Sequence, residues 1–314
     1  MTPRKSPALI ALAAAGLLAG PLSGEEAASC ETVTFSDVGW TDITATTAVA
    51  TTLLEALGYQ TNTLVLSVPV TYTSLANGQV DVFLGNWMPT MEADIATYRE
   101  AGTVDTVRVN LTGAKYTLVT NAAGAALGIA DFADIAAQAD ALDSRIYGIE
   151  PGNDGNRLIL DMIDADAFGL GGFQLLESSE QGMLAQVERA TRRDQPIVFL
   201  GWEPHPMNAN FELTYLAGGD DWFGPDFGGA EVRTNTRAGL VEECPNLGRF
   251  LQNLEFTLEL ENEIMAMILD EGVEPEAAAQ RWLSANPEAL EPWLEGVTTI
   301  DGDDGLAAVT AALD

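Results

Sequence analysis

The sequence of 314 residues contains 47 acidic side chains against 14 lysines and arginines, for a formal net charge of −33. A protein of this charge repels phosphate groups, which excludes nucleic acids as partners. Hydrophobic residues make up 47% of the chain, a share that excludes general disorder, and the length favours two lobes over one average domain.

The N-terminus has the features of a secretory signal peptide. Arg4 and Lys5 precede an apolar run over residues 8–19, which is shorter than the about 20 residues that span a bilayer. We therefore expect residues 1–24 to be a signal peptide and the mature chain to be periplasmic. Residues 27–30 loosely resemble a lipoprotein acylation site, but the usual leucine is missing and two glutamates separate Cys30 from the apolar run.

Cys30 and Cys244 are the only cysteines of the sequence. An even pair in an exported protein indicates a disulfide, and two unpaired buried thiols are the alternative. The bond would tie the start of the mature chain to its C-terminal third. Closing so long a loop is worth about 4 to 5 kcal/mol in the chain-entropy model.

Strand-like and helical segments alternate along the first part of the mature chain, as in α/β proteins with mostly parallel sheets. We expect strands over residues 32–38, 63–68 and 80–84, and helices over residues 42–57, from about 71 to 77, and to about 100 after a cap at Thr90. Two extended runs at 105–111 and 116–120, joined by residues 112–115, mark the passage into a second lobe.

The same alternation continues in the second part. The expected elements are a helix from a cap at Asp131 to 142, strands over 145–149, 173–176 and 197–200, a helix from about 157 to 167, and a helix to about 193 that a capping box of Ser178 and Gln181 opens. Residues 218–229 are predicted to be a surface loop, and residues 246–294 are predicted to be helical.

This order of elements predicts an α/β fold of two lobes, each a mostly parallel sheet flanked by helices, with a ligand in the cleft between them. The first lobe comprises residues 25–113 and the second lobe residues 114–207. Residues 208–314 return to the first lobe and include its helical C-terminal part. Such lobes close on a ligand by hinge motion.

One pattern occurs three times: a strand, then glycine, then tryptophan. Residues 82–89 read VFLGNWMP, residues 198–204 read VFLGWEP, and residues 33–40 are a looser copy. Ligands of open α/β sheets bind beyond the carboxyl ends of the strands. We therefore expect Trp40, Trp87 and Trp202 to stand on loops just past three strands as walls of one site, with core packing as the alternative.

The sequence lacks the usual signs of catalysis. His205 is its only histidine, and it has no Gly-x-Ser-x-Gly, His-Glu-x-x-His, Walker or Cys-x-x-Cys motif. We expect a binding protein rather than an enzyme, with no catalytic residue, metal or cofactor. His205 lies between two prolines beside Trp202, where we expect it to donate a hydrogen bond in a binding loop; a structural role is the alternative.

Aromatic faces suit one class of ligand in particular. A quaternary ammonium group has no N–H to donate, and tryptophan faces hold it by cation–π attraction worth about 2 kcal/mol per desolvated contact. A nearby carboxylate adds Coulomb attraction. Asp42, two residues after Trp40, is the candidate, with the N-cap of the following helix as its alternative role.

Five motifs resemble those of type II periplasmic substrate-binding proteins of ABC importers, in the quaternary-amine branch that binds glycine betaine, carnitine or choline. The motifs are GWTD at 39–42, GNWMP at 85–89, Lys115-Tyr116, PGNDG at 151–155 and GWEPH at 201–205. The likeness covers nearly the whole mature chain and is strongest to the choline-binding members.

The resemblance implies a box of four aromatic residues, with Trp40 and Trp87 from one lobe and Tyr116 and Trp202 from the other. It also implies that Asp42 faces the trimethylammonium group and that Asn153 bonds the hydroxyl of choline. Without the family resemblance, we would interpret Asn153 as a turn residue and Tyr116 as a residue that packs in a strand. The implied partners are a small quaternary amine and a membrane permease, and we expect a monomer.

Alternatives remain at this point. His205 keeps glycine betaine or carnitine open as ligands, because the matching histidine of betaine-binding relatives helps to hold the ligand carboxylate, whereas Asp42 argues against a carboxylate. The alternatives from other functional classes are a secreted hydrolase that acts on a choline ester with His205 as base, and an osmosensory or chemotaxis receptor. The other three tryptophans, Trp222, Trp282 and Trp293, are expected to be packing residues.

Overall fold

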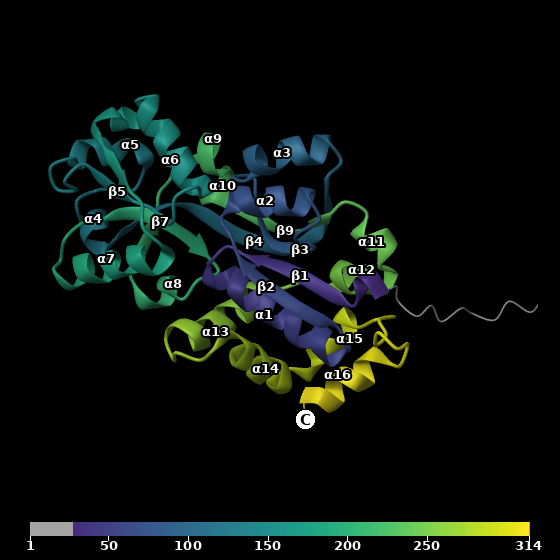
Figure 1. Cartoon of the computed structure of the whole chain (residues 1–314). Helices are drawn as coiled ribbons and strands as arrows, with labels where there is room; N and C mark the ends of the chain where they lie inside the picture. The colour runs from purple at the N-terminus through teal and green to yellow at the C-terminus, as the bar shows by residue number, and fades with distance from the viewer. Residues whose placement is uncertain (1–27, 314) are drawn as a thin grey trace, which may run out of the picture.

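The structure is a computed structural model that describes residues 28–313 (Figure 1). The predicted signal peptide lies outside the described residues. Within them, no helix combines the length and the apolar character needed to cross a bilayer.

In the described part of the chain, one nine-stranded sheet runs through the whole molecule in the order β2-β1-β3-β9-β4-β7-β5-β6, and β8 pairs with β4. The strands are β1 Thr32–Asp37, β2 Gln60–Val65, β3 Val82–Met88, β4 Val104–Asn121, β5 Arg145–Tyr147, β6 Gln174–Leu176, β7 Val198–Glu203, β8 Leu213–Tyr215 and β9 Gly229–Arg237. β1 pairs in parallel with β2 and β3, and β5 pairs in parallel with β6 and β7. The antiparallel pairs all involve β4 or β9, which join the two parallel groups.

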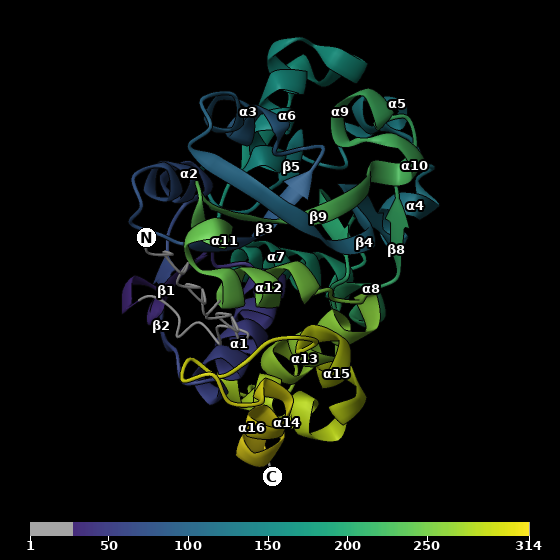
Figure 2. The same cartoon turned by 90° about the vertical axis from the view of Figure 1, so that its right-hand side faces the viewer.

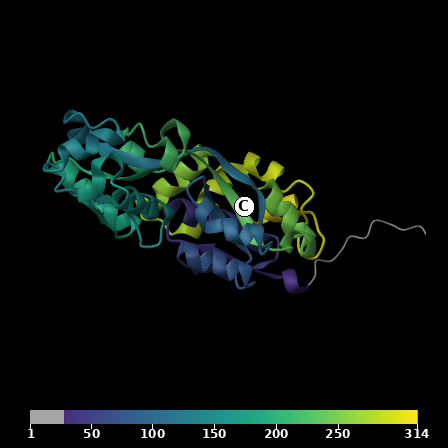
Figure 3. The same ribbon diagram turned by 90° about the horizontal axis from the view of Figure 1, so that it is seen from above.

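These two groups are the cores of two lobes. The first lobe contains β1, β2, β3, β9 and the first part of β4, with the C-terminal helices against it, and the second lobe contains β5 to β8 and the end of β4. Figure 3 shows the teal second lobe beside the purple and yellow first lobe. The expected α/β class is therefore confirmed, in the form of one sheet that is continuous across both lobes.

The helices flank this sheet. They are α1 Thr41–Ala56, α2 Val68–Ala76, α3 Glu92–Glu100, α4 Ala122–Ala126, α5 Phe132–Ile135, α6 Asp154–Asp164, α7 Glu180–Arg192, α8 Met207–Asn210, α9 Asp220–Phe223, α10 Pro225–Gly228, α11 Leu240–Glu243, α12 Pro245–Asn253, α13 Leu258–Leu269, α14 Pro275–Ala285, α15 Leu290–Trp293 and α16 Gly305–Leu313. Short 3-10 helices cover Ala28–Cys30, Ala136–Gln138, Ala167–Gly172 and Pro287–Ala289. The C-terminal helices α13, α14 and α16 pack on α1 (Figure 2).

The passages between the lobes differ from the sequence expectation in two ways. The two predicted runs at 105–111 and 116–120 are one strand, β4, that pairs with β9 in its first part and with β7 in its second. The chain also returns to the first lobe later than residue 208, because β8 pairs with the end of β4 and Phe223 packs on Phe132 of the second lobe. β8 has only three residues, too few for a periodic pattern to reveal it.

Three predicted helix starts had mixed outcomes. Asp131 caps α5 in a capping box with Asp134, but that helix ends after one turn at Ile135 and a 3-10 turn follows. α7 is capped by Ser179, whose side chain accepts from the N–H of Gly182, and not by Ser178. Thr90 caps nothing, since α3 begins at Glu92 with Met91 before it. Adjacent residues of the same type leave helix ends uncertain by a residue or two.

The disulfide is confirmed. Cys30 and Cys244 are bonded, with their Cα atoms 5.8 Å apart, and 214 residues separate them in sequence. Both cysteines are buried. The bond ties the start of β1 to the turn before α12. This link holds the C-terminal helices on the first lobe.

Candidate functional site

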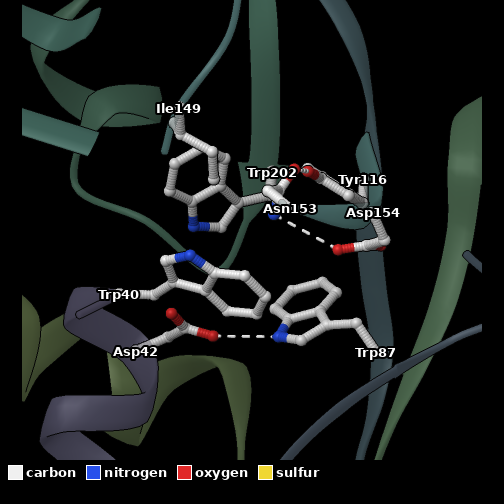
Figure 4. A pocket seen from close by; sticks show the side chains of 8 residues that line it. All are labelled: Trp40, Asp42, Trp87, Tyr116, Ile149, Asn153, Asp154 and Trp202. Carbon is white, nitrogen blue, oxygen red and sulfur yellow. Dashed lines mark hydrogen bonds between the residues drawn. The ribbon is translucent and has the colours of Figure 1, made fainter. Parts of the chain in front are cut away.

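A small cavity lies between the lobes (Figure 4). The first lobe contributes three lining residues and the second lobe contributes five. They are Trp40, Asp42 and Trp87, and Tyr116, Ile149, Asn153, Asp154 and Trp202. Six of the seven residues predicted for the site therefore line one cavity.

The three tryptophans lie at the carboxyl ends of three strands, as predicted, but two of them are still within their strands. Trp40 follows β1 and is the N-cap residue of α1. Trp87 belongs to β3 and Trp202 to β7, and each strand ends just before a cis-proline. The expected loops are thus wrong for Trp87 and Trp202.

Two of the three glycines of the repeated pattern, Gly85 and Gly201, lie within their strands and do not end them. A Cβ atom at Gly85 would lie 2.7 Å from the side chain of Ile43, and one at Gly201 would lie 2.6 Å from that of Val119. Glycine within a strand often marks such a close approach of neighbouring groups. At these two positions the pattern selects tight packing and the strand continues, whereas Gly39 lies after the end of β1 with a φ of +81°, and a Cβ atom there would meet only Val65, at 4.0 Å.

The four aromatic rings are buried and inclined to one another. The ring centroid of Tyr116 lies 6.0 Å from that of Trp87 at 58°, and 6.2 Å from that of Trp202 at 78°. Tyr116 and Trp202 are directly opposite each other in the β4–β7 ladder, which fixes their spacing. Rings at such angles present π faces and edges to one enclosed space, the arrangement that cation–π binding uses.

Asp42 is the most unusual polar group of the cavity. Its side chain is fully enclosed; Oδ2 accepts a hydrogen bond of 3.0 Å from Nε1 of Trp87, and Oδ1 has no partner within the described residues. Burial, with the charge of Glu180 as a second cause, raises the pKa of Asp42 to about 8, while the bond from Trp87 opposes the shift. The alternative role as a helix cap is not what the structure has, since Trp40 occupies the N-cap position.

Asn153 combines the two roles weighed for it. Its Oδ1 caps α6 by accepting from the N–H of Asn156 at 3.0 Å, and it also accepts from the hydroxyl of Tyr116 at 2.9 Å. Its Nδ2 donates to Oδ1 of Asp154 at 3.2 Å. The amide is therefore held in place at the wall of the cavity.

Asp154 and Ile149 were missed as lining residues. Asp154 is buried, its Oδ2 has no partner within the described residues, and burial raises its pKa to about 6. The only signal for it was its place in the PGNDG motif, because an aspartate in the first turn of a helix is ordinarily a solvated end group. Ile149 follows β5 and gave no signal beyond its apolar character.

His205 is the predicted site residue that does not line the cavity. It is buried behind Trp202, with ring centroids 4.9 Å apart. Its Nδ1 accepts from the N–H of Met207 at 2.9 Å, and its Nε2 lies 3.3 Å from Oε1 of Glu180. Since a neutral imidazole that accepts at Nδ1 has its proton on Nε2, the ring donates to Glu180 and not into the cavity.

The remaining tryptophans do not line the cavity, in agreement with the packing expectation. Trp282 stacks on Trp293 with centroids 6.3 Å apart, and Nε1 of Trp293 donates to the carbonyl of Glu255. Trp222 packs against the core from α9.

Comparison with known proteins places the chain. The family model described as OpuAC, the substrate-binding domain of ABC-type glycine betaine transport systems, matches residues 31–285. The glycine betaine/carnitine transport binding protein GbuC of Listeria monocytogenes is 38% identical over 135 residues, which are 42% of this chain and 43% of that protein. An uncharacterised protein, ORF1, of Chromohalobacter salexigens is 48% identical over 132 residues, which are 42% of this chain and 85% of that protein.

Solved structures extend the likeness to the whole described chain. An ABC-transporter choline binding protein in complex with choline is 70% identical, with a TM-score of 0.91 and coverage of 92% of this chain and 100% of that one. The corresponding protein in an unliganded semi-closed conformation has a TM-score of 0.84, with 91% and 99% covered. Lactococcal OpuAC with glycine betaine, 27% identical, has a TM-score of 0.75, with 84% and 99% covered. The chain therefore belongs to the OpuAC family of substrate-binding domains of ABC-type glycine betaine transport systems.

Proposed function

We propose that this protein binds choline in the interlobe cavity and delivers it to the membrane permease of an ABC importer. The observation that carries the proposal is the unpartnered Oδ1 of Asp42, buried against an aromatic wall. A buried carboxylate oxygen without a partner is costly, and a cation without N–H groups satisfies it by charge alone. The π faces around it accept the methyl groups of the same cation.

The polar groups favour choline over glycine betaine. Two carboxyl groups, Asp42 and Asp154, line the cavity and would oppose the carboxylate of betaine. The amide of Asn153 and the carboxyl of Asp154 lie side by side, where they offer a donor and an acceptor to a hydroxyl group. His205, which had kept betaine open, donates to Glu180 instead.

The likeness to the choline complex supports the same ligand. The chain has a higher TM-score with that complex than with the unliganded semi-closed form at the same identity. We take the described arrangement as the closed one, in which hinge closure has brought Trp202 and Tyr116 over Trp40 and Trp87. Export by the N-terminal segment and action as a monomer are further parts of the proposal.

The test is calorimetric titration of the mature protein with choline and with glycine betaine at matched ionic strength. We expect choline to bind at least tenfold more tightly, a difference of about 1.4 kcal/mol. Equal or tighter binding of betaine would contradict the argument from the two carboxyl groups, and binding of neither would refute the proposed function. Incubation with a choline ester tests the hydrolase alternative, for which we expect no turnover.

A further inference from the structure

Beyond the shared strands, polar contacts join the lobes around the cavity. Trp40 donates from Nε1 to Oε1 of Glu150 at 2.8 Å. Arg157 of α6 donates to the carbonyl of Thr90 and to Asp94 of α3, at 3.0 and 2.9 Å. These contacts are only partly buried, and the partly exposed ion pair of Arg157 and Asp94 contributes little.

The third contact is different, because it is fully buried. Glu180, at the start of α7 in the second lobe, accepts two hydrogen bonds from Thr41 of the first lobe. The N–H of Thr41 lies 2.9 Å from Oε2, and its hydroxyl oxygen lies 2.5 Å from Oε1. The side chain of Glu180 is 0% exposed. Charge-assisted bonds in a buried place are the strong ones.

Both ends of this contact are fixed in place. On the second lobe, His205 donates to Oε1 of Glu180 and is itself held by the N–H of Met207. On the first lobe, Thr41 is the first residue of the 16-residue helix α1, whose N-cap residue Trp40 has no capping side-chain bond. The carboxylate of Glu180 therefore supplies the missing cap from the other lobe and faces the positive end of the helix.

The same contact adjoins the cavity from both sides. Thr41 stands between Trp40 and Asp42, and His205 packs edge-on against Trp202. Separating the lobes would remove the cap of α1 and would withdraw Trp202 from Trp40 and Asp42 in one movement. Glu180 itself does not line the cavity.

We propose that Glu180 and Thr41 form an interlobe latch, held in position by His205, that stabilises the closed form and sets the rate at which the ligand leaves. Glu180 is thus a positioning residue for ligand retention. The inference rests on the proposed function for its ligand, but the contact itself exists without one. It also explains why the only histidine of the chain is buried behind the aromatic wall.

The test compares the dissociation and association rates of choline in wild type and E180Q by stopped-flow tryptophan fluorescence. The glutamine keeps the size of the side chain and removes its charge. We expect choline to leave E180Q at least tenfold faster, with an association rate within about twofold of wild type, because the latch forms after the ligand has entered. The matched control is E188Q, which makes the same change at an exposed position of the same helix, where Glu188 pairs with Arg192; its rates should equal those of wild type.

A second variant separates the latch from local damage. T41V lies in the first lobe and removes only the bond from the Thr41 hydroxyl to Glu180. Because both substitutions break the same contact, the effects of T41V and E180Q should not add in the double variant. Additive effects, or a dissociation rate of E180Q within twofold of wild type, would overturn the latch.

Failure of the proposed function is distinguishable. If wild type does not bind choline, the radius of gyration of ligand-free wild type and E180Q, from small-angle X-ray scattering, decides the matter. A larger radius for E180Q supports the latch, and equal radii overturn it.

Discussion

The substitution D42N tests the central feature of the site, the buried carboxylate. The asparagine has the same shape, and its amide oxygen still accepts the bond from Nε1 of Trp87. At about 4 Å and an effective dielectric constant of about 20, the attraction between the carboxylate and a quaternary ammonium is worth about 4 kcal/mol. Part of this is spent on ionisation, because burial raises the pKa of Asp42 to about 8.

The net effect follows from the two terms. At pH 7, which is about one unit below the pKa of Asp42, ionising its carboxyl group costs about 1.4 kcal/mol. The difference of about 2.5 kcal/mol corresponds to a loss of roughly 70-fold in choline affinity. Affinity for glycine betaine should fall less, because the substitution also removes the repulsion of the betaine carboxylate.

Calorimetric titration of wild type and D42N with both ligands at pH 7 and constant ionic strength measures these changes. Circular dichroism of the two proteins serves as the folding control. A choline affinity of D42N within threefold of wild type would refute the assignment of Asp42 as the group that meets the cation. Equal losses for choline and betaine would refute its role in selecting between them.

Three further predictions concern the aromatic box, the titrating carboxyl groups and the disulfide. W87A and W202A should each weaken choline binding at least tenfold, about 1.4 kcal/mol, because each removes a cation–π face; W282A, outside the cavity, should leave the affinity unchanged, and the idea of a box fails if all three bind alike. Burial raises the pKa values of Asp42, Glu150 and Asp154 to about 8, 7 and 6. The stability that these acids contribute is fully present below their pKa values in the unfolded chain, near 4, and is lost as the pH rises through the folded values of 6 to 8. A quaternary ammonium favours the ionised forms, and the increase in Tm that choline produces should therefore grow from pH 5 to pH 8; an increase that is independent of pH would contradict the assigned shifts. Replacing Cys30 and Cys244 together by serine should lower the free energy of unfolding by about 2 to 5 kcal/mol, measured by urea denaturation, and should not change choline affinity, since the bond lies at the opposite ends of the strands from the cavity.

The sequence alone indicated the fold class, the disulfide and most of the cavity wall, because each depends on patterns that are local in the chain. Alternating elements predict parallel sheets, and the carboxyl ends of parallel strands share one edge, which accounts for Trp40 and Trp87 as neighbours at the ends of β1 and β3. Trp202 lies at the end of β7 in the other lobe and meets them across the cavity. Tyr116 and Asn153 came from the family resemblance and not from such a pattern. Both are lining residues in the structure.

Only the tertiary structure decided which polar group faces which. Whether His205 points to a ligand or to Glu180, and whether Asp42 caps a helix or accepts a hydrogen bond from Trp87, depends on side chains that are far apart in sequence. The tertiary structure also decided where the chain returns to the first lobe, which is at β9. The three-residue strand β8 before it pairs with β4 in the second lobe and has no sequence pattern of its own. Local propensity acts over a few residues, whereas burial and the pKa shifts that follow from it arise from the packing of the whole chain.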